Sequence, residues 1–145
     1  MTIRRLIRRG DIESGSITLE IAIPLLTDAL DTTSSTPAES NERYSVSSAL
    51  ISSASAVYFE FAYDATALTS DGSIDLYDVD AASPITTLTL TAGSSSERTR
   101  STDILSGLQS ASGHEIKVRL TSDGTNRAVV YMARLILVID IGSGS

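Results

Sequence analysis

Apolar and polar residues alternate along most of this chain, and a period of two predicts β-strands that each turn one face to a core. We expect strands at residues 16–26, 43–52, 56–63, 74–79, 85–91, 97–101, 114–121 and 128–141. Turn residues such as Gly72 and Gly124 separate these segments at roughly ten-residue spacing. About eight strands at this spacing predict an all-β fold, an antiparallel sandwich with jelly-roll topology.

Single residues refine this prediction. Pro24 lacks a backbone donor, which places the first strand at a sheet edge or ends it in a bulge there. Phe59 and Phe61 alternate on one face and mark the centre of the core. The alternation slips once within residues 74–91, as it does at a β-bulge. Two segments predict connections: residues 28–41, which are small and polar, and residues 102–113, with one helical turn.

The last strand, residues 128–141, is apolar on both faces, whereas a strand in a sandwich normally shows one face to water. One face carries Val129, Tyr131, Ala133, Leu135, Leu137, Ile139 and Ile141; the other carries Val130, Met132, Ile136 and Val138, with Arg134 between them and Asp140 at the end. Exposing the second set would forgo on the order of 6–10 kcal/mol. Two arrangements would cover it: the strand changes sheets halfway, or a second copy of the chain packs on it.

Arg134 separates these arrangements, because a charge at this position must reach solvent or pair with a carboxylate. An ion pair with Asp or Glu on a neighbouring strand would suit a strand inside one sandwich. A partner across a subunit contact would suit assembly. For an oligomer interface, we expect a set made of the basic N-terminal residues and part of this strand: Arg4, Arg5, Arg8, Arg9, Met132, Arg134 and Ile136.

A length of 145 residues suits one domain, with residues 1–15 as a basic N-terminal arm or edge strand and residues 16–145 as a single jelly-roll domain. The chain has no Cys, which excludes a disulfide framework, a thiolate zinc site and a cysteine nucleophile. The first residues lack the apolar core of a secretory signal, so we expect cytoplasmic synthesis or a leader already removed. No apolar run is long enough to predict a membrane-spanning helix.

Charge is distributed unevenly along the chain. The formal net charge is −7, and once the four arginines of the first ten residues are set aside, residues 11–145 carry −11. An acidic body of this kind repels phosphates, so we expect no nucleic-acid partner. The basic arm could bind a polyanion, and the acidic surface of a neighbouring copy is an equally good target.

Several residues are candidates for chemistry. Clustered carboxylates could hold a structural calcium ion at Asp71, Asp75, Asp78 and Asp80, although the spacing is not that of an EF-hand. His114 could act as a general base, but neither G-x-S-x-G nor S-x-x-K accompanies it, and a structural role at a strand start fits better. Paired carboxylates could hydrolyse a glycoside only across a cleft that no spacing here requires. We therefore expect no catalytic residues and no cofactor.

Two other candidates concern binding. The tripeptide Arg9-Gly10-Asp11 is known from cell adhesion, but three residues recur by chance. Tyr58, Tyr77 and Tyr131 could form a sugar platform if they converged, since aromatic rings stack on saccharides. Trp, which often builds such platforms, is absent.

Several sequence segments resemble parts of jelly-roll structural proteins of tailed phages and related viruses, and of some thermophile surface proteins. The segments are MTIRRLIRRGDIESGSITLEIAIP, AVYFEFAY, SIDLYDVDAASPI, SERTRST, SASGHEIKVRL and YMARLILVID. The resemblance implies a non-enzymatic virion component, such as a capsid decoration or tail-associated subunit, and carries no catalytic residues. The doubly apolar last strand favours a homo-oligomer, a trimer or another closed form, and the resemblance adds a major capsid or tail protein that it could contact. Its location would be the virion, after assembly in the host cytoplasm. The alternative is a carbohydrate-binding module or surface-filament subunit at an extracellular surface.

Overall fold

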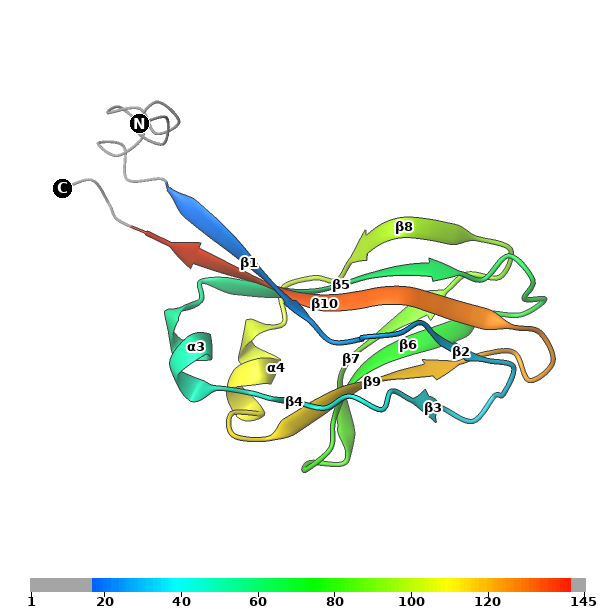
Figure 1. The fold of residues 1–145 in the computed structure, drawn as a ribbon, viewed down its shortest axis with the longest axis horizontal. Helices are drawn as coiled ribbons and strands as arrows, with labels where there is room; N and C mark the ends of the chain where they lie inside the picture. Colours follow the sequence, from blue (N-terminus) through cyan, green and yellow to red (C-terminus); the bar gives the residue numbers. More distant parts are fainter. Residues whose placement is uncertain (1–16, 142–145) are drawn as a thin grey trace.

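Two antiparallel sheets pack face to face in the computed structural model, which describes residues 17–141 (Figure 1). Sheet A contains β1 (Thr18–Pro24), β2 (Leu30–Thr32), β5 (Ala56–Asp64), β8 (Ser95–Arg100) and β10 (Ala128–Asp140). Sheet B contains β3 (Ala38–Glu39), β4 (Tyr44–Ser45), β6 (Gly72–Asp78), β7 (Ser83–Leu90) and β9 (Glu115–Thr121). Two short helices, α3 (Ser48–Ser53) and α4 (Leu105–Ser110), contact each other at one end of the sandwich.

The strand order is that of a jelly roll. Sheet A runs β1-β10-β5-β8, with β2 also beside β10, and sheet B runs β3-β9-β6-β7, with β4 also beside β9. The pairs are nested along the chain: β1 and β2 with β10, β3 and β4 with β9, β5 with β8, and β6 with β7. This is the arrangement of one long hairpin rolled into two sheets, which confirms the predicted fold class.

The core lies between the sheets and is centred where the sequence predicted. Phe59 and Phe61 of β5 are fully buried, with ring centroids 5.3 Å apart. Leu76 of β6 and Val118 of β9 lie in the same cluster from the opposite sheet. Burial of each such side chain contributes about 1.5–3 kcal/mol, so this layer holds the two sheets together.

The apolar pattern of β10 is explained by a bulge and not by a change of sheet. β10 stays in sheet A along its whole length, with β5 on one side and β2, then β1, on the other. Its register with β5 shifts between Val130 and Met132, which makes Tyr131 the extra residue. The core-facing positions are therefore Ala128 and Val130 before the bulge, and Ala133, Leu135 and Leu137 after it.

The bulge excludes one of the two arrangements expected for this strand and corrects which of its residues share a face. The strand does not switch sheets, and Val130 belongs to the core, whereas Tyr131 is 57% exposed. Ile136 does lie on the outer face but is only 3% exposed, because it sits between Ala22 of β1 and Tyr58 of β5. The second apolar face is thus smaller than the sequence suggested, and part of it is covered by neighbouring strands.

Local predictions met mixed outcomes. β1 is an edge strand that ends at Pro24, as expected, and a register shift between Leu76 and Tyr77 confirms the predicted slip. The predicted strand at residues 43–52 is only half correct: β4 is followed by α3, whose N-cap Ser47 accepts a hydrogen bond from the Leu50 amide. The loop predicted at residues 28–41 contains β2 and β3, while the helical turn after residue 102 is confirmed as α4.

No helix within residues 17–141 has the length and apolar character needed to cross a membrane.

Gly72 at the start of β6 is required by a close backbone approach. A Cβ at this position would lie 2.5 Å from the Thr121 carbonyl oxygen and 3.1 Å from a Leu68 methyl. Because the nearer atom is backbone, the Gly72→Ala variant must displace β9, and we expect a loss of about 1–3 kcal/mol in the free energy of unfolding. Urea denaturation measures it.

The matched control is Ser83→Ala, at an exposed position of the same sheet. Surface substitutions of this kind change the free energy of unfolding by less than about 0.5 kcal/mol. Equal effects of the two substitutions would contradict the steric explanation.

Candidate functional site

A charged cluster occupies the outer face of sheet A, on the side away from the core. At its centre is Glu60 of β5, which lies opposite Arg134 of β10 on one side and Arg100 of β8 on the other. Arg98 lies two residues before Arg100 on the same strand and also reaches Glu60. Residues directly opposite each other on neighbouring strands point to the same face, which brings these four side chains together.

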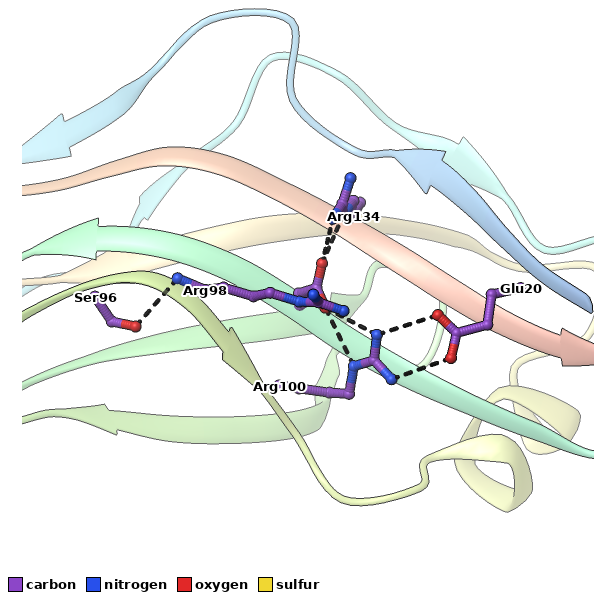
Figure 2. Close-up of polar contacts among 6 residues, drawn as sticks. Glu20, Ser96, Arg98, Arg100 and Arg134 are labelled. Carbon is purple, nitrogen blue, oxygen red and sulfur yellow. Dashed lines mark hydrogen bonds and ion pairs between the residues drawn. The ribbon is translucent and has the colours of Figure 1, made fainter.

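The carboxylate of Glu60 is fully buried and is shared by three guanidinium groups, those of Arg98, Arg100 and Arg134, which are labelled in Figure 2. Its Oε1 accepts a hydrogen bond from Arg134 Nε at 2.7 Å. Its Oε2 accepts from Arg98 Nε at 2.8 Å and from Arg100 Nε and Nη2 at 3.1 and 3.0 Å. Both oxygens are thus engaged by charged donors, the strongest class of hydrogen bond in proteins.

Arg100 extends the cluster to the first strand. Its two terminal nitrogens lie 3.4 Å from the carboxylate oxygens of Glu20 on β1. Its guanidinium also lies over the ring of Tyr58, 5.1 Å from the centroid. The cluster therefore joins all four strands of the β1-β10-β5-β8 path through side chains as well as through the backbone ladder.

Burial would raise the pKa of Glu60, but hydrogen bonds from Arg98, Arg134 and Arg100 outweigh it and lower that pKa from 4.5 to about 2. The carboxylate is therefore ionised at any physiological pH, and its low pKa makes it a weak general base. The arrangement suits a structural cross-link better than catalysis, because both oxygens are occupied.

The sequence predicted one part of this cluster. Arg134 has its partner within the chain, as in the interpretation that placed a carboxylate on a neighbouring strand. Of the other residues expected at an oligomer interface, Met132 is half-buried and Ile136 is buried. Arg4, Arg5, Arg8 and Arg9 lie outside the described residues, as does the Arg9-Gly10-Asp11 tripeptide.

Glu60, Arg98 and Arg100 were missed as functional candidates. Glu60 could have been noticed, because it is the one charge within the apolar segment AVYFEFAY. Its partners could not be found from the sequence, because they lie 38, 40 and 74 positions away and meet it only through strand pairing.

The four aspartates proposed for calcium do not converge in the described part of the chain. Asp71 accepts a hydrogen bond from the Ala92 amide, and Asp75 pairs with Arg119 at 2.8 Å. Asp78 and Asp80 do come together, with His114, so that their ligand atoms lie within 4.8 Å of one another.

That trio is already committed to local contacts. Oδ2 of Asp78 lies 2.8 Å from Nδ1 of His114, and its Oδ1 accepts hydrogen bonds from the amides of Asp80 and Ala81. Oδ2 of Asp80 accepts from the Glu115 amide. The contacts hold the turn after β6 against the start of β9, which agrees with the structural role expected for His114.

The three tyrosines considered for a sugar platform do not gather. Tyr77 belongs to sheet B, where Arg119 covers its ring at 3.7 Å. Tyr58 and Tyr131 belong to sheet A, and Tyr58 lies under Arg100.

Tyr131 instead borders a hollow of about 430 Å³ on sheet A. The hollow is lined by residues of β5, the start of β8 and the β10 bulge: Ala62, Tyr63, Asp64, Ser95, Ser96, Glu97 and Tyr131.

No protein-family model matches this chain, and no curated protein does. Among solved structures, the chain is similar to a T=1 particle derived from infectious bursal virus, with 10% identity and a TM-score of 0.40 over 87% of this chain and 32% of that one. It is also similar to the VP2 subviral particle of infectious bursal disease virus, with 12% identity and a TM-score of 0.35, over 87% and 33%. A third match is the Gx strain of that virus, with 12% identity and a TM-score of 0.33, over 90% and 39%. The chain thus spans about a third of the length of the structures it matches.

Glu60→Gln should destabilise the fold by about 3–5 kcal/mol, because it leaves three guanidinium groups without their shared anion. The folded-state pKa of about 2 lies below the ordinary 4.5, so the contribution is present above pH 4.5 and lost as pH falls towards 2. Urea denaturation between pH 2.5 and 7 should show a steep acid loss in the wild type and a shallower one in the variant. Glu20→Gln is the matched control, since a half-exposed pair contributes at most about 1 kcal/mol.

His114→Asn should remove a pH-dependent part of the stability near neutrality. Its hydrogen bond with Asp78, outweighing partial burial, raises the pKa of His114 above 6.5. A raised pKa means that the contribution is complete below pH 6.5 and is lost as pH rises through the folded-state value. The wild-type melting temperature should therefore fall, relative to that of the variant, as pH rises above 6.5. Parallel curves for the two proteins would show that this pair does not titrate as described.

Proposed function

We propose that this chain is a non-enzymatic structural protein that forms homo-oligomers within a virion, as a capsid decoration or tail-associated subunit. The observation that carries the proposal is an uncovered apolar surface at one end of sheet A. There the start of β1 and the end of β10 run side by side past the start of β5, whose last paired position on β10 is Val138 (Figure 1). We call this two-stranded projection, residues 17–19 and 139–141, the terminal ribbon.

The terminal ribbon carries apolar side chains that the described chain leaves open. Leu19 and Ile141 are each 45% exposed, and Ile17 and Ile139 are half-buried. The register pairs Leu19 with Ile139, and the Ile141 amide donates to the Ile17 carbonyl, so these four residues share one face. That face is continuous with Ile21 and Leu137, which reach the core. An apolar face at an edge strand favours burial against another subunit.

Charge favours a second copy as the partner. The ribbon ends where residues 1–16 begin, and four arginines lie among the first ten residues, while residues 11–145 carry −11. A basic segment and an acidic body on the same chain are complementary between copies. A closed ring or trimer would satisfy every subunit in the same way.

The charged groups of the described chain favour a structural role. Glu60, Asp75 and Asp78 are buried, and each is held by a cation or a histidine. The virion as the location, with assembly in the host cytoplasm and contact with a major capsid or tail protein, is supported by the resemblance of the sequence to viral jelly-roll proteins. Jelly rolls also occur in lectins and cupins, so the fold alone does not choose among these classes.

A carbohydrate-binding module at an extracellular surface is the second candidate. The exposed ring of Tyr131 beside hydroxyl and carboxylate groups is the observation that favours it.

Size-exclusion chromatography with light scattering tests the proposal. We expect a discrete oligomer at micromolar concentration. A monodisperse monomer would contradict the assembly proposal and favour the binding module. Deletion of residues 1–9 should weaken assembly more than it lowers the melting temperature, because in this proposal the arm joins copies. Equal losses of both would count against an intersubunit role for the arm.

A further inference from the structure

The hollow beside Ala62 is produced by two bulges that flank one small residue. On the β10 side, Tyr131 is the extra residue next to Ala62. On the β8 side, Phe61 pairs with Thr99 and Tyr63 with Ser96, which leaves two residues of β8 opposite Ala62. A bulge on each side bends the neighbouring strands. The methyl group of alanine then leaves a hollow of about 430 Å³ open on the surface.

The lining of this hollow is acidic and aromatic. Asp64 and Glu97 contribute two carboxylates, and the lining residues contribute no positive charge. Hydrogen bonds from Thr66, together with the nearby charge of Arg127, hold the pKa of the Asp64 carboxyl below its ordinary value, so it stays ionised. Tyr131 is 57% exposed, so the residue is open to a ligand from solvent. Carboxylates next to an open aromatic face attract a cation that can pair and stack at once, as a guanidinium does.

The described chain builds this kind of unit twice and completes it each time with arginine. On sheet B, Arg119 lies 3.7 Å from the Tyr77 ring centroid and pairs with Asp75. On sheet A, Arg100 lies over Tyr58 and pairs with Glu20. Tyr131 has the aromatic ring and the carboxylates, but no cation of residues 17–141 lies over it.

None of the described arginines is free to complete the third unit. Within residues 17–141 each one already pairs with a carboxylate: Arg43 with Glu115, Arg98, Arg100 and Arg134 with Glu60, Arg119 with Asp75, and Arg127 with Asp31. The remaining arginines of the sequence are the four of the arm.

The arm of the same copy is poorly placed to supply it. Ile17 pairs beside Ile141, which follows Tyr131 by ten residues along and just past β10. At the usual rise of a strand, that separation is roughly 33 Å. β1 runs from that end towards the hollow, so the preceding residues would have to reverse direction.

Reach alone does not distinguish the two copies, because Arg4 lies thirteen residues before Ile17 and a segment of that length spans up to about 45 Å. The reversal that a contact within one copy requires is what favours a second copy.

We propose that this hollow is the docking site for an arm arginine of a second copy, whose guanidinium stacks on Tyr131 and pairs with Asp64 and Glu97. The inference rests on the homo-oligomer of the proposed function and names its contact. The arm and the hollow are different surfaces, so each subunit inserts its arm into one neighbour and accepts the arm of another. The contact is therefore heterologous. Such contacts close into a ring when the rotation between neighbours permits.

Two full-length variants test the contact by complementation. One replaces the four arm arginines with glutamine (Arg4→Gln, Arg5→Gln, Arg8→Gln and Arg9→Gln) and keeps the hollow. The other, Tyr131→Ala, keeps the arm and opens the hollow. Light scattering should show that each alone loses the wild-type mass, whereas an equimolar mixture forms heterodimers, because one partner supplies the arm and the other the hollow. Circular dichroism checks that both are folded, which we expect because Tyr131 is exposed.

Matched controls define the chemistry. Tyr131→Phe keeps the ring and should retain the wild-type mass, whereas Asp64→Asn with Glu97→Gln should weaken association about tenfold. Asp28→Asn removes one exposed carboxylate elsewhere and should have no such effect. Association should also weaken with added salt, since the contact pairs charges at the surface.

Four other results would overturn the docking site. A wild-type oligomer that both variants preserve overturns the docking site and leaves the assembly proposal standing. Variants that lose mass without recovery in the mixture show that arm and hollow belong to different contacts, which also overturns the docking site. A monomeric wild type overturns the proposed homo-oligomer and the docking between copies together. Binding of neutral oligosaccharides on a glycan array that Tyr131→Ala abolishes would assign the hollow to sugar and overturn the arm as its occupant.

Discussion

Side chains of a strand alternate between two faces, so β10 can place both its first and its second half in the core only if one residue leaves the register. Tyr131 is that residue. Its bulge turns Ala128 and Val130 to the same side as Leu135 and Leu137. Without the bulge, even-numbered and odd-numbered positions of the strand would face opposite sides. The same shift directs Arg134 outward to Glu60 and exposes the Tyr131 ring. The core, the charged cluster and the hollow therefore all depend on one extra residue.

The charged cluster shows how the outer face of sheet A stays ordered without a second layer. Glu60 is as buried as the core phenylalanines, yet it lies on the opposite face. Long arginine stems can cover apolar surface while their heads remain polar, which suits a face that also carries Ile136. Replacement of such a buried pair by apolar residues can be neutral for stability. Arginine and glutamate here also leave the face polar, which opposes indiscriminate stacking of sheets.

The sequence predicted those features that depend on local alternation. The fold class, the phenylalanine centre, the edge position of β1 and the slip in residues 74–91 all follow from the period of two or from proline. The bulge in β10 could not be predicted, because the residues before and after it are apolar on both faces. A change of face there does not alter the pattern of apolar and polar residues. The helix α3 was taken for a strand because Val46 and Leu50, four positions apart, fit either period. The partners of Glu60 depend on pairings between distant strands, which no local pattern records.

The nested pairing also orders events in time. β1, near the start of the chain, closes sheet A only against β10, more than a hundred residues later. Contacts of such separation form late, because the intervening chain must be ordered first. The terminal ribbon therefore does not exist on a nascent chain until residues 128–140 have been synthesised and have folded onto β5. A partly synthesised subunit has no terminal ribbon with which to contact another subunit. The topology of the jelly roll therefore restricts contacts through this ribbon to completely folded chains.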